Sequence, residues 1–291
     1  MARRRPPTVH GLAVVDKPAG VTSHDVVTML RRRLGERQIG HSGTLDPSAT
    51  GVLLIGVGKG TRILRFLTIL GKSYTGEVVF GSTTSTLDDQ GEVTASFDMG
   101  NLTPARVSAV AAEHLTGDIM QVPPMVSALK VDGRRLHELA REGIEVERAP
   151  RPVRIHDLVL TPTDDPMVYR IDVACSSGTY VRTIADDLGR LLGGGAHLRR
   201  LRRTAVGSFG QREAAPPDTC ALLPLRVALR DYDIVEVDEQ TAALVRRGQV
   251  LPRFAGTEQS SGPWAVVSGP ELLAVYEPFR PGTVKPAVVV G

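Results

Sequence analysis

The chain has 291 residues, of which 42% are hydrophobic and 23% charged, and its formal net charge is +3. This balance predicts a soluble globular protein with one large core or two domains. The longest apolar runs are too short to span a bilayer, and no apolar stretch typical of a secretory signal follows the arginines at residues 3–5, so we expect a cytoplasmic protein. Cys175 and Cys220 lack the spacing of a zinc site or a disulfide framework, which argues against a metal.

Hydrophobic periodicity and turn signals predict a mixture of strands and helices. In the first part of the chain we predict a strand and turn over 9–18, a helix over 26–34 capped by residues 22–25, and a strand or helix start over 51–57. In the middle we predict strands over 72–81 and 92–95, a helix over 104–115, paired strands over 151–160 and 169–174, and a helix over 180–192. The last part is predicted to form short strands over 234–237, 264–267 and 272–276.

The segments between these elements predict how the chain is divided. Residues 122–150 are bounded by prolines, which is typical of a mobile excursion from the core. Residues 214–224 hold three prolines and indicate a domain boundary. The short strands beyond this boundary are separated by Gly and Pro turns, as in a small β-barrel.

Arginines form three clusters, which are residues 31–33 with 37, 134–135, and 199–200 with 202–203. Guanidinium groups form bidentate contacts with phosphates, so each cluster can bind a polyanion. Each can equally be a solvated face of the protein. The sequence leaves both interpretations open.

The most informative stretch is Gly40–Leu53, because it sets one carboxylate, Asp46, in a turn of glycines, hydroxyls and a proline. Gly43 allows a positive φ, and Pro47 disfavours helical geometry at Asp46 itself. Such a turn presents the acid at a loop corner. The alternative is that Asp46 only caps the segment that follows it.

This stretch resembles the motif G-H-x-G-T-L-D-P-x-A-T-G-V-L of pseudouridine synthases of the bacterial tRNA type, the TruB family. The resemblance implies an α+β fold. Residues 1–215 are then a pseudouridine synthase catalytic domain with a mixed sheet flanked by helices, residues 122–150 are an RNA-clamping insertion, and residues 232–291 are a PUA-like RNA-binding β-barrel.

The resemblance also implies the reaction, in which the T-loop uridine at tRNA position 55 is flipped out and isomerised to pseudouridine. The bond from ribose C1′ to N1 of uracil is broken and the ring is rejoined through C5. No redox step or external group is needed, so one ionised carboxylate can suffice without cofactor or metal. The expected partner is the tRNA T-stem-loop, without a guide RNA or a protein partner, and the expected state is a monomer.

The family motifs assign roles to five residues. Asp46 is the catalytic carboxylate, and Arg182 pairs with it in a stretch that resembles C-S-x-G-T-Y-I-R-x-L. Tyr74 packs against the flipped base. His41 helps to fill the space that the base leaves, and Leu201 lines an apolar pocket.

Further motif positions are implied to order the site. Asp88 lies in a turn that resembles T-D-T-x-D-x-x-G. Lys17 is the first residue of a stretch that resembles the K-P-x-G-x-x-S opening of the family. In the insertion, Val126 and His137 stand where many relatives carry tyrosine, which weakens the expectation of stacking there.

Two other functions compete with this one. The same basic surfaces suit a binding protein that helps tRNA to fold, with catalysis secondary. A carboxylate glycosidase needs a second acid at a set separation, and none is obvious near Asp46. A guide-RNA-dependent relative is disfavoured because the chain lacks long lysine-rich tails.

Overall fold

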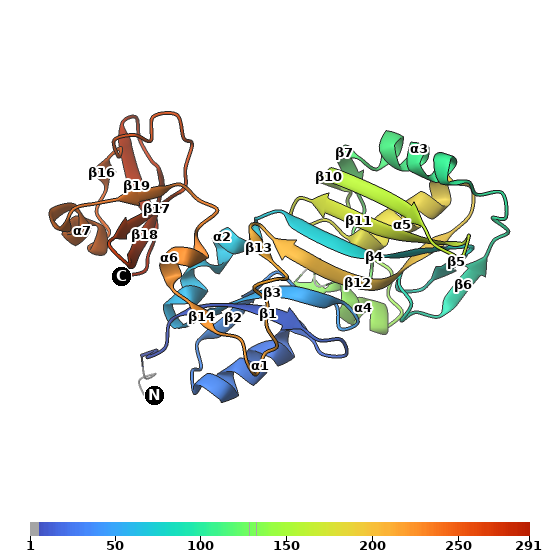
Figure 1. The fold of residues 1–291 in the computed structure, drawn as a ribbon, viewed down its shortest axis with the longest axis horizontal. Coiled ribbons are helices and arrows are strands. Elements are labelled where there is room, and N and C mark those ends of the chain that lie inside the picture. Colours follow the sequence, from blue (N-terminus) through green and yellow to red (C-terminus); the bar gives the residue numbers. More distant parts are fainter. Residues whose placement is uncertain (1–5, 128, 132) are drawn as a thin grey trace.

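A computed structural model describes residues 6–127, 129–131 and 133–291, and in these residues ten strands form one mixed sheet (Figure 1). Its main path runs β14-β1-β3-β12-β4-β11-β10-β7, with β2 on β3 and β13 on β12. The strands are β1 (Gly11–Lys17), β2 (Ile39–Ser42), β3 (Thr50–Val57), β4 (Lys72–Phe80), β7 (Gly117–Gln121), β10 (Arg151–Pro162), β11 (Val168–Cys175), β12 (Ala196–Val206), β13 (Phe209–Gly210) and β14 (Leu222–Leu223).

Helices and small hairpins connect and cover this sheet. They are α1 (Ser23–Leu34), the 3-10 helix η1 (Gly58–Ile63), α2 (Leu64–Thr68), the hairpin of β5 (Ser82–Thr84) and β6 (Val93–Ser96), α3 (Pro104–His114), the hairpin of β8 (Lys130–Val131) and β9 (Arg134–Arg135), α4 (Leu136–Arg141), α5 (Val181–Leu191) and α6 (Leu225–Ala228). None of the described helices is long and apolar enough to cross a membrane.

Helix α1 begins three residues before the predicted start because Thr22 caps it. The Thr22 hydroxyl accepts from the Asp25 amide, and the Asp25 carboxylate accepts from the Thr22 amide at 2.8 Å. This reciprocal capping box satisfies two donors that a helix start leaves free. Gly35 ends the helix in the left-handed conformation. The predicted helix is therefore confirmed and lengthened at its start.

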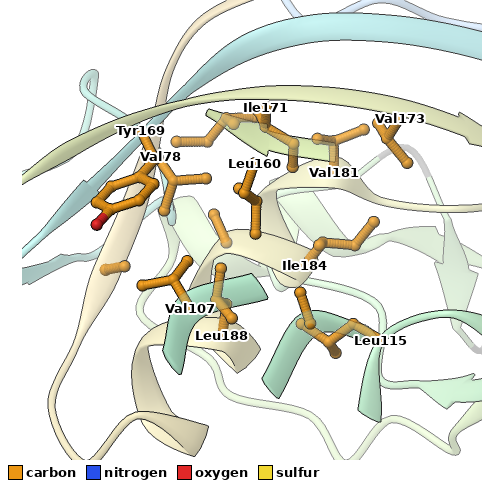
Figure 2. Packing of buried hydrophobic residues seen from close by; sticks show 14 of the residues in the cluster. Val78, Val107, Leu115, Leu160, Tyr169, Ile171, Val173, Val181, Ile184 and Leu188 are labelled. Carbon is orange, nitrogen blue, oxygen red and sulfur yellow. The ribbon is translucent and has the colours of Figure 1, made fainter. Parts of the chain in front are cut away.

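The larger core lies where α3 and α5 cover one face of β4, β10 and β11 (Figure 2). Val78, Leu160 and Ile171 point from the strands toward Val107 of α3 and Ile184 of α5. The strands predicted at 72–81, 151–160 and 169–174 are confirmed, and β10 pairs with β11 in antiparallel register.

Strand β1 is buried on both faces, which accounts for its almost unbroken apolar sequence. Ala13 and Val15 pack with α1, whereas Leu12 and Val14 pack on the opposite face. Residues of the C-terminal module, which follows residue 232 in the chain, belong to that second cluster, and Ala265 is one of them. The two parts of the chain thus share a hydrophobic core.

Segment 214–224, predicted as a boundary, packs against this sheet. Ala215 pairs with Val15, and β14 pairs with β1 through Leu223 and Leu12. The sheet therefore takes in chain that follows residue 215. Segment 122–150 holds the β8–β9 hairpin and α4, with Leu136 and Leu139 buried. Ala128 of its motif lies outside the described residues, and the side chain of His137 is not described.

The C-terminal module has a five-stranded sheet in the order β15-β17-β18-β19-β16. Its elements are β15 (Ile234–Glu236), α7 (Glu239–Arg246), β16 (Leu251–Pro252), β17 (Trp264–Ser268), β18 (Glu271–Pro278) and β19 (Thr283–Val289). The predicted PUA-like barrel is not confirmed, because the two edge strands do not pair in the described chain and the sheet remains a half-barrel. These edge strands have three and two residues.

Gly51 lies where β3 pairs with β12 in parallel register, beside Arg203. Its φ is +102°, and a Cβ added there would lie 2.1 Å from the Arg203 carbonyl oxygen. We expect Gly51→Ala to lower the free energy of unfolding by more than about 2 kcal/mol, because strain and overlap with backbone act together.

Urea denaturation measures this loss. Gly117→Ala is the matched control, since Gly117 has a φ of +83° with no atom near its added Cβ. An equal loss in both variants would show that the close approach of β12 adds nothing.

Candidate active site

Two cavities, of about 490 Å³ and 310 Å³, lie on either side of the Asp46 turn. Asp46, Arg182 and Leu201 line both of them. Tyr74 lines the larger cavity, and Asp88 lines the smaller one. The structure thus brings together residues from β4, β12, α5 and two loops. Among the described residues, His, Cys, Asp and Glu do not gather in groups of three that could hold a metal ion.

The Asp46 carboxylate forms an ion pair with Arg182, at 2.9 Å from Oδ2 to Nη2. The Arg182 side chain is 4% exposed, whereas that of Asp46 is 37% exposed. One charge is therefore held inside the protein, and the other faces the cavity. Asp46 is presented at the surface of the site, as the turn predicted.

Arg182 is held in place by more than its partner carboxylate. Its Nη1 donates to the Thr86 carbonyl and its Nη2 to the Val126 carbonyl, both at 2.8 Å. Its Nε lies 3.8 Å from the Asp88 carboxylate. A guanidinium with fixed donor directions suits such a set of acceptors better than a flexible ammonium. Arg182 therefore links the Asp46 turn to the Asp88 turn and to the insertion.

The start of α5 places Arg182. Tyr180 precedes the helix, and the Gln121 amide binds both of its backbone groups, accepting from the Tyr180 amide at 2.8 Å and donating to the Tyr180 carbonyl at 3.1 Å. The end of β7 thus fixes the first turn of α5. The positive end of the helix dipole adds to the field that favours a carboxylate there.

Buried polar side chains hold the backbone on both sides of Asp46. Lys17 is fully buried, and its ammonium donates to the Pro47 carbonyl at 3.2 Å. The Ser23 hydroxyl accepts from the Leu45 amide at 2.9 Å. Arg203 is 1% exposed and donates to the Gly43 carbonyl at 3.3 Å. The turn is therefore braced from three elements.

Burial of Lys17 changes the pKa of its ammonium group. Desolvation lowers the pKa of Lys17 to about 8, against the attraction of Asp46, which raises it. The family resemblance predicted a site-ordering role for Lys17, and its contacts are with backbone carbonyls rather than with the Asp46 side chain.

Tyr74 and Leu201 form walls of the larger cavity and pack against the larger core. Tyr74 is half-buried, and burial raises the pKa of its phenol, with nearby Arg203 acting in the opposite direction. His41 lies on β2 and is not among the described residues that line either cavity. Burial and the charge of Arg203 lower the pKa of His41.

Asp88 is set in a polar turn beside β12. Its carboxylate accepts from the Thr86 hydroxyl at 2.5 Å and from the Gln90 amide at 3.1 Å. The residue before it, Leu87, has a φ of +62°, and its carbonyl accepts from the Leu198 amide at 3.0 Å. These bonds order the turn independently of Arg182.

Comparisons with known proteins agree with this arrangement. A family model described as the N-terminal domain of TruB family pseudouridylate synthase matches residues 31–181, and one described as the tRNA pseudouridylate synthase B C-terminal domain matches residues 182–218. The tRNA pseudouridine synthase B of Symbiobacterium thermophilum is 49% identical over 248 residues, which are 82% of each chain. That of Geobacillus thermodenitrificans is 42% identical over 96% of this chain and 99% of its own. The chain belongs to the TruB family.

The fold of this TruB family member also resembles a solved structure described as a Cbf5-Nop10-Gar1 complex. The TM-score is 0.74 over 97% of this chain and 85% of that chain, with 23% sequence identity. This similarity shows the pseudouridine synthase fold, with its mixed sheet and helices, and the α+β prediction is confirmed to that extent.

Sequence reasoning missed two cations of this TruB family site. Arg203, in a cluster for which phosphate binding and a solvated face were both left open, is instead buried and bound to backbone carbonyls, including that of Val52 at 2.6 Å. Lys72 is buried in the wall of the larger cavity. The only local signal was the position of Lys72 two residues before Tyr74, where a strand places both on one face.

Four other members of the arginine clusters also have partners in the protein. Arg202 binds the Asp16 carboxylate at 2.8 Å, and Arg33 donates to the Cys220 carbonyl at 2.6 Å. Arg199 and Arg200 both pair with Glu77. The Arg200 side chain is 71% exposed, whereas those of Arg199 and Arg202 are 34% and 31% exposed.

Proposed function

We propose that this chain is a tRNA pseudouridine synthase that isomerises the T-loop uridine at position 55, with Asp46 as its catalytic group. Membership of the TruB family supports the conversion of uridine in tRNA to pseudouridine. The observation that carries the assignment to Asp46 is its accessible carboxylate, paired with the buried Arg182 and open to two cavities.

The reaction needs an ionised carboxylate beside a base that has left its stack. The Arg182 guanidinium offsets the charge of Asp46 and fixes the direction of its free oxygen. Tyr74 offers an aromatic face for the flipped uracil, and Leu201 an apolar one. His41 acts outside the cavity, by filling the space that the base leaves in the RNA. No cofactor or metal has a role in this proposal.

The partner in this proposal is the T-stem-loop of tRNA, bound by a cytoplasmic monomer without a guide RNA or a protein partner. Residues 1–215 form the catalytic domain, and residues 122–150 clamp the RNA. Residues 232–291 act as a PUA-like RNA-binding module. Supporting this last role, Phe279 is 45% exposed, and Arg280 and Lys285 lie 5.0 and 5.2 Å from its ring centroid.

Incubation with an unmodified tRNA transcript tests the proposal. Pseudouridine mapped by chemical probing is expected in the T loop, and a transcript with cytidine at position 55 is expected to remain unmodified. Modification at other sites, or none with correctly folded tRNA, would contradict the assignment.

Arg200 is expected to contact an RNA phosphate. It has a φ of +56° at a bulge of β12, a strained conformation that aims an exposed side chain beside the smaller cavity. The logarithm of the tRNA association constant is expected to fall linearly with the logarithm of salt concentration. Replacing both Arg199 and Arg200 with alanine is expected to reduce the slope of that line by up to about two units. Selectivity for the uridine is expected to be unchanged, because phosphate contacts do not read the base.

Filter-binding titrations across a salt series measure that slope. Arg190→Ala is the matched control, since Arg190 is also exposed and paired with carboxylates but lines neither cavity. A slope that is the same in the double variant and the wild type would place the RNA path elsewhere.

A further inference from the structure

Lys72 is a cation in the wall of the larger cavity that the reaction described above does not use. It begins β4, two residues before Tyr74, so both side chains lie on one face of the strand. Further along this face, Val78 and Phe80 belong to the apolar core. The face changes from apolar to polar where the cavity opens.

The Lys72 ammonium is fixed in position. The residue is 7% exposed, and its Nζ donates to the carbonyls of Thr68 and, at 2.6 Å, Leu70. These carbonyls lie at the end of α2 and just beyond it. An ammonium has three donors, so the described contacts leave one for a ligand in the cavity.

Isomerisation places a negative charge in this cavity. When the C1′–N1 bond breaks, its electron pair stays on N1 and is delocalised onto the uracil carbonyl oxygens. An electron pair of the ring then forms the C5–C1′ bond, the C5 proton leaves, and N1 takes up a proton. The detached ring is thus an anion beside the Asp46 carboxylate.

Resting on the proposed function, we propose that Lys72 is a further catalytic residue, whose ammonium contacts the detached uracil and stabilises its negative charge. Lys72 keeps its protons throughout, so the balance of the isomerisation is unchanged. A fixed cation aimed at a developing charge needs no reorganisation during the reaction and acts more strongly in a water-poor site.

The other two cations that line this cavity in the described chain are committed elsewhere. Arg182 forms an ion pair with Asp46 and donates to two backbone carbonyls. Arg203 donates to the carbonyl of Val52 and to that of Gly43 in the Asp46 turn. Lys72 is therefore the cation best placed to meet a charge on the base.

Its ionisation provides a signature, which Lys17 shares because burial also lowers the pKa of Lys17 to about 8, so replacement of Lys72 alone is needed to separate the two. Burial and the nearby Arg203 lower the pKa of Lys72 to about 8, against an opposing effect of Cys175. The ammonium is present below pH 8 and lost above it. Between this pKa and the usual value of 10.5, the unfolded chain binds more protons than the folded one, so the contribution of Lys72 to stability rises with pH. A loss of activity above pH 8 then does not reflect unfolding through this group.

Single-turnover kinetics of the full-length chain on an unmodified tRNA transcript, from pH 6.5 to 9.5, test the proposal. Lys72→Met is expected to slow the reaction about 100-fold at pH 7, with tRNA affinity within about threefold of the wild type. Lys72→Arg is expected to stay within about tenfold and to move the alkaline loss of activity to higher pH, because a guanidinium keeps its proton. Lys59→Met, outside the cavity, is the matched control and is expected to match the wild type.

The proposal is overturned if Lys72→Met retains the wild-type rate, or if the alkaline loss in Lys72→Arg coincides with that of the wild type. A loss in Lys72→Met that follows only its folded fraction, measured by circular dichroism, would show a structural role and also overturn it. The wild-type chain distinguishes these outcomes from failure of the proposed function, because it must form pseudouridine in the same assay.

Discussion

Asp46→Asn is expected to lower pseudouridine formation by more than about 10⁴-fold while leaving tRNA affinity within about threefold of the wild type. The amide keeps the volume of the side chain and removes the charge and basicity that the reaction needs. The turn is expected to keep its shape, because Lys17, Ser23 and Arg203 brace its backbone and not the carboxylate.

Single-turnover assays and filter binding with the same transcript measure the two effects separately. Asp118→Asn is the control, since Asp118 is an exposed carboxylate on β7 that pairs with another arginine, Arg154. Appreciable turnover by Asp46→Asn would remove Asp46 from the catalytic role. If the inactive variant still promotes tRNA refolding, the folding activity considered as the alternative function exists beside catalysis.

Arg182→Met is expected to reduce the rate by about 100-fold or more. Removing one partner of a buried ion pair costs about 3–5 kcal/mol. We expect this cost to be present in the transition state, where about 1.36 kcal/mol is a factor of ten in rate. Because Asp46 is 37% exposed, water compensates part of this cost, and the lower end of the range applies. The carbonyls of Thr86 and Val126 also lose a donor, so the melting temperature is expected to fall.

Rates and thermal unfolding of Arg182→Met and Arg182→Lys check this expectation. The lysine variant keeps the charge without the fixed donor geometry, and its rate is expected to lie between those of Arg182→Met and the wild type. Full activity in Arg182→Met would show that Asp46 acts without its ion pair. If only the stability changes, the role of Arg182 is to join the three segments.

Local rules in the sequence determined most of the secondary structure. The caps around α1, the alternation in β4 and the apolar period of α3 depend on neighbours a few residues away, and the elements they predicted are present. The Asp46 turn follows the same logic, because Pro47 and the glycines restrict the backbone wherever the chain folds. The predicted site roles rest on family motifs and stay predictions until the variants are measured.

Only the tertiary structure decided which charges are available for chemistry. The four arginines within residues 199–203 look alike in sequence. Arg203 is nevertheless buried against backbone carbonyls, while Arg200 is exposed. The same holds for Lys72, whose place in the cavity depends on α2 and β11 as well as β4. Asp46 and Arg182 meet because a sheet pairs strands that lie far apart in the chain. Burial and long-range pairing set the environment of a charged side chain, and neither can be predicted from the residues next to it in sequence.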